Sequence, residues 1–190
     1  MYDDNLAYDS YEIIEGEKFM SPSPFKQHMY IMNNIFFKIQ FYLRGKKTAR
    51  VFTDNMDVHL PDGNLVKPDL FVVCDRKILK DTYTVYGVPD FVVEILSRST
   101  MYYDKNRKKR IYEANGVKEY WIVNPFDETV SVYLLRGGKL ELDNIYSFLT
   151  EDEFNLLDDE DKAAIKTDIK LSIFDDLTVT VEEIFYDIED

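Results

Sequence analysis

Two acidic residues, Asp69 and Glu94, interrupt otherwise apolar stretches and are the strongest candidates for chemistry in this sequence. Asp69 lies within residues 67–73 (KPDLFVV) and Glu94 within residues 90–96 (DFVVEIL), and both stretches have the length of a β-strand. An ionised carboxylate is costly in an apolar setting unless it is paired with a base or bound to a cation. One such residue is commonly satisfied by backbone amides or a neighbouring base, but two on adjacent strands favour a shared metal ion.

Asp90 competes with Asp69 for this role, because Pro89-Asp90 repeats the pair Pro68-Asp69. Asp90 and Glu94 would face the same side of one strand, but four residues at ~3.3 Å each separate their Cα atoms by about 13 Å. Oxygen ligands of one Mg²⁺ lie ~2.1 Å from the ion and therefore about 3–4 Å from each other. Asp69 on a neighbouring strand, ~4.8 Å away, meets this requirement. We therefore predict Asp69 and Glu94 as the metal-binding pair and Asp90 as a residue at the start of a strand.

The elements that must position this pair can be predicted from the spacing of apolar residues. Continuous apolar runs such as residues 67–73 and 90–96 are typical of central strands covered on both faces. Residues 25–43 and 101–115 have helical spacing, and a glycine follows each of them (Gly45, Gly116). We predict a hairpin at 11–20 and further strands at 49–53, 56–60, 118–123, 129–135, 140–142 and 171–181, with a short helix at 181–185. This pattern predicts an α/β fold.

The net charge of −13 hides an uneven distribution along the chain. Residues 141–190 contain 17 Asp and Glu against 3 Lys, and residues 1–17 contain six acids and no base. The stretch 18–140 carries 20 bases and 13 acids, with the highest basic density at Arg98 and at residues 105–110. A locally basic face can attract a polyanion even when the whole molecule is acidic. Nucleic acid is therefore not excluded as a partner.

Length and composition suit one domain over residues 1–190, with an acidic elaboration at about 150–168. The single cysteine, Cys74, excludes an internal disulfide and a zinc site built from thiolates. The N-terminal segment has neither the basic start nor the apolar stretch of a signal peptide, and no apolar window approaches the ~18 residues of a membrane span. We therefore expect a cytoplasmic protein without a membrane partner.

Three segments of the sequence resemble the Uma2-like restriction endonuclease family, a group within the PD-(D/E)XK nuclease superfamily. They read VKPDLFVV, GVPDFVVEILSRST and YDKNRKKRIYEANGVKEYWIVNP. The resemblance extends to YEIIEGEKFMSPSP, to the helix that begins near His28 and to LTVTVEEIF, so it covers most of the chain except the acidic segment. It implies a restriction-endonuclease-like core in the order αβββαβ, with a mixed central sheet flanked by helices, an N-terminal hairpin and extra C-terminal strands.

The resemblance also implies that Asp69, Glu94 and the backbone carbonyl of Ile95 bind Mg²⁺ or Mn²⁺, which would activate water and polarise a phosphodiester. The lysine that the superfamily pattern places two residues after the glutamate is missing, because Leu96 stands there. In relatives of this kind the lysine has moved to the next helix, where Lys108 holds the matching position. There it would orient the attacking water or stabilise the charge that develops on the phosphoryl group.

The spacing of residues on the second helix supports Lys108 independently. Asp104, Lys108 and Tyr112 are four residues apart and share one helix face. The alternative role for Lys108 is a weak surface pair with Asp104. Lys105 and Lys109 form a second row that would meet solvent or phosphate. The residues predicted to bind nucleic acid are Arg98, Lys105, Arg107, Lys109 and Arg110.

Supporting roles at the site are expected for Asp104, Tyr112, His28 and Asp57. His28 lies near the start of the first long helix, which the implied fold places beside the metal cleft, although a lone histidine on a helix is more often structural. Asp57 is either a supporting acid or a strand-end residue, and the sequence leaves both readings open.

Two functions are compatible with these residues. The first is a metal-dependent endonuclease that hydrolyses DNA, expected as a homodimer because cutting both strands often requires two active sites. The second is a nucleic-acid-binding or protein-interaction module that retains the fold without catalysis, which the displaced lysine and the acidic surface favour. Metal-dependent cleavage that is lost on replacement of Asp69 or Glu94 supports the first. Salt-sensitive binding without turnover supports the second.

Overall fold

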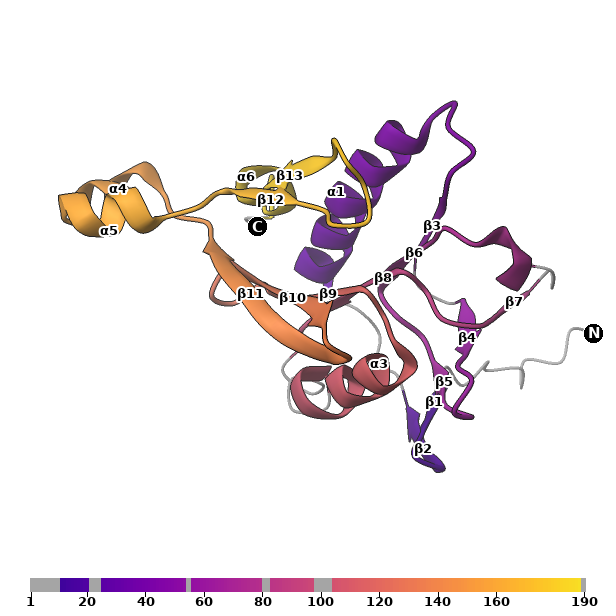
Figure 1. The fold of residues 1–190 in the computed structure, drawn as a ribbon. Coiled ribbons are helices and arrows are strands. Elements are labelled where there is room, and N and C mark those ends of the chain that lie inside the picture. Colours follow the sequence, from indigo (N-terminus) through magenta and orange to yellow (C-terminus); the bar gives the residue numbers. More distant parts are fainter. Residues whose placement is uncertain (1–10, 21–24, 54–55, 80–82, 98–103, 189–190) are drawn as a thin grey trace, which may run out of the picture.

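A six-stranded mixed sheet forms the centre of the molecule in the computed structural model, which describes residues 11–20, 25–53, 56–79, 83–97 and 104–188 (Figure 1). The strand order is β11 (Lys139–Ser147), β10 (Thr129–Arg136), β9 (Glu119–Asn124), β8 (Phe91–Ile95), β6 (Leu70–Val73) and β3 (Arg50–Thr53). Strands β8 and β9 run parallel, and the other neighbouring pairs are antiparallel. Strands β6, β8 and β9 are buried along their whole length, as the continuous apolar runs of β6 and β8 predict.

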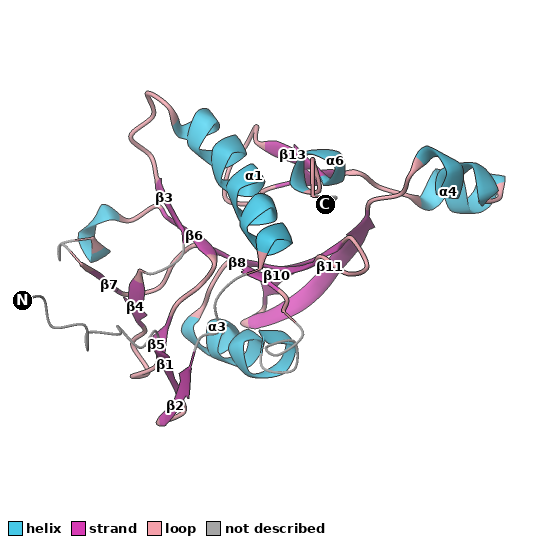
Figure 2. Cartoon of the chain, turned by 180° about the vertical axis from the view of Figure 1, so that it is seen from behind, coloured by secondary structure: helices cyan, strands magenta, loops and turns pink. Residues whose placement is uncertain are grey.

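Helix α1 (Lys26–Leu43) lies across one face of this sheet (Figure 2). Its residues Ile31, Ile35, Ile39 and Leu43 recur every four positions, which gives one apolar stripe that is buried against the sheet. The hairpin of β12 (Asp168–Lys170) and β13 (Thr178–Thr180) and the short helix α6 (Val181–Ile184) pack into the same apolar cluster. The prediction of a continuous strand over residues 171–181 is wrong, because residues 171–177 form the turn of this hairpin.

Helix α3 (Lys109–Asn115) covers the opposite face, where Ile111 and Tyr112 pack against side chains of β6, β8 and β9. It continues from a π-helical turn, η2 (Asp104–Lys108), so the described part of the predicted helix at 101–115 is not α-helical throughout. The helix ends at Gly116, whose φ of +83° is the left-handed conformation that glycine adopts readily at a helix C-terminus. The elements α1, β3, β6, β8, α3 and β9 follow one another in the predicted order αβββαβ.

A second, five-stranded sheet adjoins the α3 side of the molecule (Figure 1). Its order is β2 (Glu17–Met20), β1 (Tyr11–Ile14), β5 (Leu65–Val66), β4 (Asp57–His59) and β7 (Thr84–Tyr86). Strands β1 and β2 form the predicted N-terminal hairpin. Ile14, Val58 and Val66 belong to the same apolar cluster as Ile111 of α3. The hairpin is therefore held beside α3, within reach of the end of β8.

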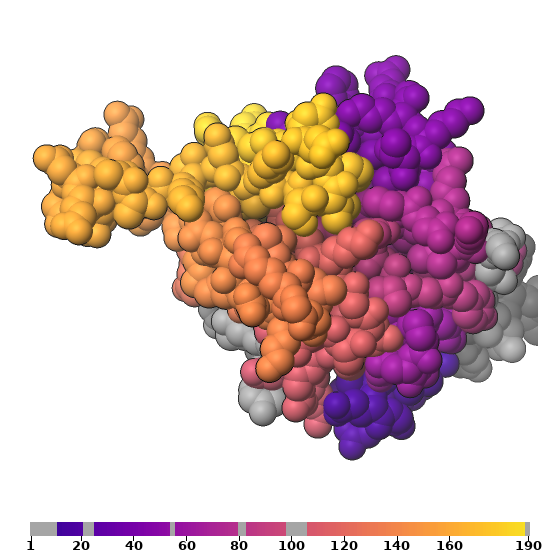
Figure 3. Space-filling model, viewed as in Figure 1, coloured from indigo at the N-terminus to yellow at the C-terminus, as the bar shows by residue number. Residues whose placement is uncertain are grey.

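The acidic elaboration at about 150–168 forms two short helices, α4 (Glu151–Leu156) and α5 (Asp159–Ala164), which project from the body (Figures 1 and 3). Thr150 and Asp158 cap their N-termini by accepting hydrogen bonds from backbone N–H groups. Neither helix contains a buried residue, and Leu156 is 86% exposed. None of the helices in the described part of the chain is long and apolar enough to cross a membrane.

Glu119, at the start of β9, ties the main sheet to the C-terminal hairpin. It is fully buried, and one of its carboxylate oxygens accepts a hydrogen bond from Trp121 Nε1 at 2.6 Å. The other oxygen accepts from the backbone N–H and the hydroxyl of Ser172, both at 2.6 Å. Burial raises the pKa of Glu119 above its ordinary value, and these hydrogen bonds oppose the shift without cancelling it.

The raised pKa of Glu119 makes its contribution to stability depend on pH. Above the ordinary value of 4.5, the folded protein keeps a proton that the unfolded chain has lost. This stabilisation is present in full at lower pH and is lost as pH rises through the folded-state pKa. We therefore expect the wild type to lose stability relative to Glu119→Gln as the pH rises from about 4.5 through the folded-state pKa of Glu119. Urea titrations of both proteins at a series of pH values measure the difference, and a difference that does not change with pH contradicts the prediction.

Candidate active site

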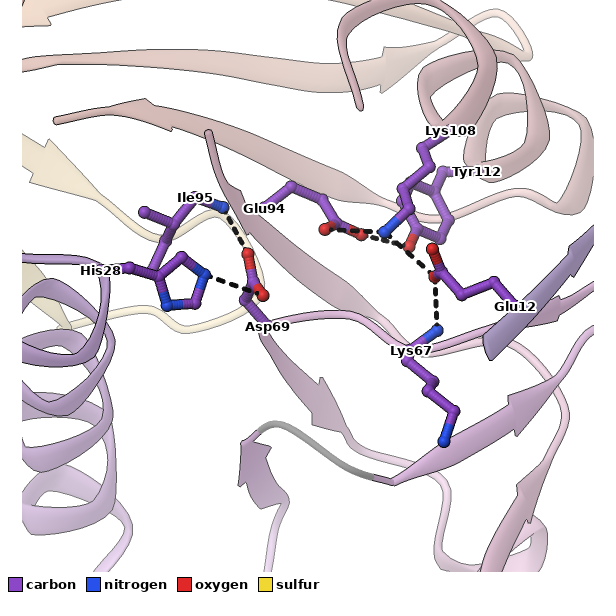
Figure 4. Close-up of polar contacts among 8 residues, drawn as sticks. All are labelled: Glu12, His28, Lys67, Asp69, Glu94, Ile95, Lys108 and Tyr112. Atoms are coloured by element: carbon purple, nitrogen blue, oxygen red, sulfur yellow. Dashed lines mark hydrogen bonds and ion pairs between the residues drawn. The ribbon is translucent and has the colours of Figure 1, made fainter. Parts of the chain in front are cut away.

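The pairing of β6 with β8 brings Asp69 and Glu94 together. Leu70 lies opposite Val93, so the next pair along the two antiparallel strands is Asp69 and Glu94. Asp69 directly precedes β6, and Glu94 lies within β8. Side chains alternate between the two faces of a strand, and Phe71 and Glu94 both lie on the face of the sheet that α3 covers. Figure 4 shows the two carboxylates at the end of these strands.

Glu94 is held by two side chains from the helical segment. It is only 2% exposed. Lys108 Nζ donates to its Oε2 at 3.0 Å, and the Tyr112 hydroxyl donates to its Oε1 at 2.6 Å. Lys108 and Tyr112 are four residues apart across the junction of η2 and α3, and both point to the same carboxylate (Figure 4). Lys108 is itself 6% exposed, so it is a buried partner of Glu94 and not a surface residue.

Asp69 receives its contacts from the other side of the site. The backbone N–H of Ile95 donates to its Oδ2 at 2.6 Å, and His28 Nε2 lies 3.0 Å from its Oδ1. His28 comes from the first turns of α1 and is buried. The side chain of Asp69 is 18% exposed, more than that of Glu94, so the site opens to solvent on the Asp69 side.

Glu12 of strand β1 belongs to the same cluster, although the sequence did not single it out. It is 8% exposed, and its Oε1 lies 3.0 Å from Lys108 Nζ. The same oxygen accepts a hydrogen bond from the backbone N–H of Lys67 at 2.7 Å. One signal could have found it: in a hairpin strand Glu12 shares a face with Ile14, which is buried, whereas Tyr11 and Ile13 face the other way.

Two other acids of the sequence lie away from this cluster. Asp90 stands just before β8, at the end opposite Glu94, and accepts hydrogen bonds from Cys74 N at 2.7 Å and Lys118 Nζ at 2.6 Å. Asp57 of β4 pairs with Lys67 Nζ at 2.8 Å. Figure 4 shows the Lys67 side chain pointing away from Glu12, while the backbone N–H of this lysine donates to Glu12, so Lys67 joins Asp57 to the site.

The basic residues predicted to bind nucleic acid are spread around the helical segment. Arg107 lies 3.2 Å from Glu17 of β2 and over the ring of Phe19. Lys109 lies on the other flank, 3.9 Å from Glu113 and over the ring of Tyr133. Arg110 is exposed. Arg98 and the side chains of Asp104 and Lys105 lie outside the described part of the chain.

The electrostatics of the cluster keep Tyr112 protonated. Its burial, and after that the neighbouring carboxylate of Glu94, raise the pKa of Tyr112 well above its ordinary value. The hydroxyl therefore remains a hydrogen-bond donor to Glu94. Within the described residues, no three His, Cys, Asp or Glu side chains gather closely enough to form a metal site alone. A cation here would take two carboxylates and complete its shell with backbone oxygen, substrate or water, as Mg²⁺ commonly does.

Comparisons with known proteins agree with this architecture. A family model named Uma2, described as "Putative restriction endonuclease", matches residues 4–160. A crystal structure described as "a putative nuclease belonging to DUF820 from Anabaena variabilis" superposes with a TM-score of 0.70 at 16% sequence identity. That match covers 96% of this chain and 93% of the other. No curated protein matched the sequence. The similarity in structure confirms the predicted restriction-endonuclease-like fold class.

Proposed function

Because the chain belongs to the Uma2 family of restriction-endonuclease-like proteins, we propose that it is a metal-dependent endonuclease that hydrolyses phosphodiester bonds in DNA. The observation that carries the proposal is the position of Lys108. Its ammonium lies 3.0 Å from the buried carboxylate of Glu94. The superfamily pattern places the lysine two residues after this glutamate, where the present sequence has Leu96. A lysine from the neighbouring helical segment therefore restores the combination of two carboxylates and one ammonium at the end of β6 and β8.

The donor set of the site fits a divalent metal ion. Asp69 and Glu94 supply carboxylate oxygens, which Mg²⁺ and Mn²⁺ prefer. The N–H of Ile95 points to Asp69, and the carbonyl of a strand residue points to the same edge as its N–H, so this carbonyl is the third expected ligand. Asp69, Glu94 and Glu12 carry three formal negative charges against the single positive charge of Lys108, and one divalent cation balances the difference. When bound, it would activate water and polarise the phosphodiester.

The side chains around the two carboxylates have separate roles in this proposal. Tyr112 and Lys108 fix the two oxygens of Glu94, and His28 and the Ile95 N–H fix those of Asp69. Such outer contacts orient metal ligands. The ammonium of Lys108, itself buried, would orient the attacking water or stabilise charge on the phosphoryl group.

DNA is the proposed substrate, and the basic residues of the helical segment are its proposed contacts. Arg110 is exposed. Arg107 pairs with Glu17 and Lys109 with Glu113, and a DNA phosphate would compete with these carboxylates for the two bases. Cutting both strands of a duplex calls for two sites, so we propose a homodimer as the active form, which light scattering with and without DNA would test. DNA binding that weakens steeply with salt, without turnover in Mg²⁺ or Mn²⁺, would instead favour the inactive module.

Metal binding can be tested without DNA. We expect Asp69→Asn to weaken Mn²⁺ binding by at least about tenfold, because the substitution removes an anionic ligand while keeping the size of the side chain. Isothermal titration of the wild type and the variant measures the affinity. Asp90→Asn is the matched control, since Asp90 lies at the far end of β8, and its affinity should equal that of the wild type. Equal affinities in all three proteins would place the ion elsewhere.

A further inference from the structure

Glu12 connects the N-terminal hairpin to both halves of the candidate site. Its Oε1 lies 3.0 Å from Lys108 Nζ and 2.7 Å from the backbone nitrogen of Lys67, two residues before Asp69. Lys108 is therefore placed between two buried carboxylates, Glu12 and Glu94, each 3.0 Å from its ammonium (Figure 4). We propose that Glu12 is a positioning residue, which holds the Lys108 ammonium in the site when a metal ion binds Glu94.

The need for such a residue follows from the charges. In the described structure Lys108 is a counter-ion of Glu94. A divalent cation on Glu94 would neutralise that carboxylate and repel the nearby ammonium. Lysine has a flexible four-carbon stem, so an ammonium without a partner would turn toward solvent. Glu12 is buried on the far side of Lys108 and contacts its ammonium directly, so it offers a second carboxylate partner that keeps the ammonium next to the reacting groups.

The second contact of Glu12 links the hairpin to the segment that carries Asp69. Strand β1 pairs with β5 at Ile13 and Leu65, and the bond from Lys67 N–H to Glu12 continues this pairing toward Asp69. The position of Lys108 relative to Asp69 is thus set through one carboxylate. Glutamine at position 12 keeps an oxygen for the Lys67 N–H and removes only the charge, so Glu12→Gln separates the positioning of Lys108 from the folding of the hairpin.

The chain offers a matched control for this variant. Glu17 lies on the other strand of the same hairpin and pairs with Arg107, a base of the same π-helical turn as Lys108, at 3.2 Å. Its side chain is exposed and contacts neither carboxylate of the proposed metal pair. Glu17→Gln therefore removes a hairpin-to-helix ion pair of the same type without touching the Lys108 ammonium.

The inference rests on the proposed function, so its first test uses Mg²⁺ alone and no DNA. Proton–nitrogen spectra of lysine ammonium groups, recorded on the full chain, should contain a signal that Lys108→Arg removes. We expect saturating Mg²⁺ to shift this signal without abolishing it in the wild type and in Glu17→Gln, and to abolish it in Glu12→Gln. Retention of the signal in Mg²⁺-saturated Glu12→Gln overturns the positioning role alone. If Mg²⁺ leaves the wild-type spectrum unchanged, the metal site itself fails, and the positioning role with it.

Kinetics supply a second, independent measurement. We expect Glu12→Gln to lower kcat for DNA cleavage by about 10- to 100-fold, with KM changed by less than about twofold. In a Lys108→Met background, Glu12→Gln should change kcat by less than about twofold, because its effect passes through the ammonium. An equal loss in both backgrounds would mean that Glu12 supports only the fold, and would overturn the proposal. Absence of cleavage by the wild type would instead count against the proposed function.

Discussion

Replacing Glu94 with glutamine is expected to lower the rate of Mg²⁺-dependent DNA cleavage by at least about 10³-fold. The substitution keeps the size of a side chain that is almost fully buried but removes the anionic oxygens proposed to hold the metal. Loss of a metal that stabilises transition-state charge by several kcal/mol corresponds to a rate loss of roughly this size. Asp69→Ala and Glu94→Ala should abolish cleavage in the same way.

The assay compares the wild type with these variants on plasmid, linear and single-stranded DNA, each with Mg²⁺ and Mn²⁺. The three substrates also report whether the protein nicks, cuts duplexes or prefers single strands. Asp90→Asn serves as the carboxylate control, because its contacts are with Cys74 and Lys118 at the other end of the strand. Identical traces of activity in the wild type and the inactive variants would reveal a contaminating nuclease and sink the assignment.

Replacing Lys108 with methionine is expected to destabilise the metal-free protein by about 3–5 kcal/mol. The variant keeps much of the volume of the side chain but leaves Glu12 and Glu94, both buried, without their shared counter-ion. Removal of one partner from a buried ion pair costs about this much, because the remaining charge is desolvated and uncompensated. Mg²⁺ should restore part of the lost stability, since a cation on Glu94 supplies the missing charge.

Urea unfolding with and without Mg²⁺ measures both effects. Lys109→Met is the control for stability: Lys109 is the next residue, is half-buried and lies 3.9 Å from Glu113, and such a pair contributes about 0–1 kcal/mol. A Lys108→Met protein as stable as the control would show that Glu12 and Glu94 do not depend on Lys108 as their shared counter-ion, and would contradict the prediction. Cleavage by Lys108→Met should fall by about 10²-fold or more, because the ammonium acts on developing charge.

The central part of this fold follows from the sequence because its strands are covered on both faces. The stretches that follow Asp69 and surround Glu94 are continuous apolar runs, which are buried only when both faces of the strand are covered. The stripe of Ile31, Ile35 and Ile39 likewise shows which face of α1 packs against the sheet. Within such strands a carboxylate is conspicuous, and residues four apart on the next helix, Lys108 and Tyr112, could be expected to meet it.

The rest of the site depends on contacts between distant parts of the chain. In the sequence alone Glu12 is an ordinary hairpin residue, and only the pairing of β1 with β5 brings it to the site. Strand β5 has two residues, too few to show a periodic pattern. Strand β7 consists of three residues that favour strands, but it is too short to show a period, and its pairing with β4 defines it. The apolar residues at 171–177 suggest a strand, but they lie in a turn from which their side chains pack into the core. These features are specified by tertiary pairing, which local patterns do not encode.

The C-terminal layer over α1 has a consequence for how the protein is made. Asn34 of α1 donates to the carbonyl oxygens of Ile184 and Tyr186, and Lys38 pairs with Glu183. Chains emerge from the ribosome N-terminus first. Helix α1 and the main sheet are therefore synthesised before this layer, and the helix precedes it by more than a hundred residues. Until residues 169–188 arrive, the apolar side of the nascent sheet and helix lacks part of its cover. Completion of the scaffold that holds the two carboxylates therefore waits for the synthesis of residues 169–188.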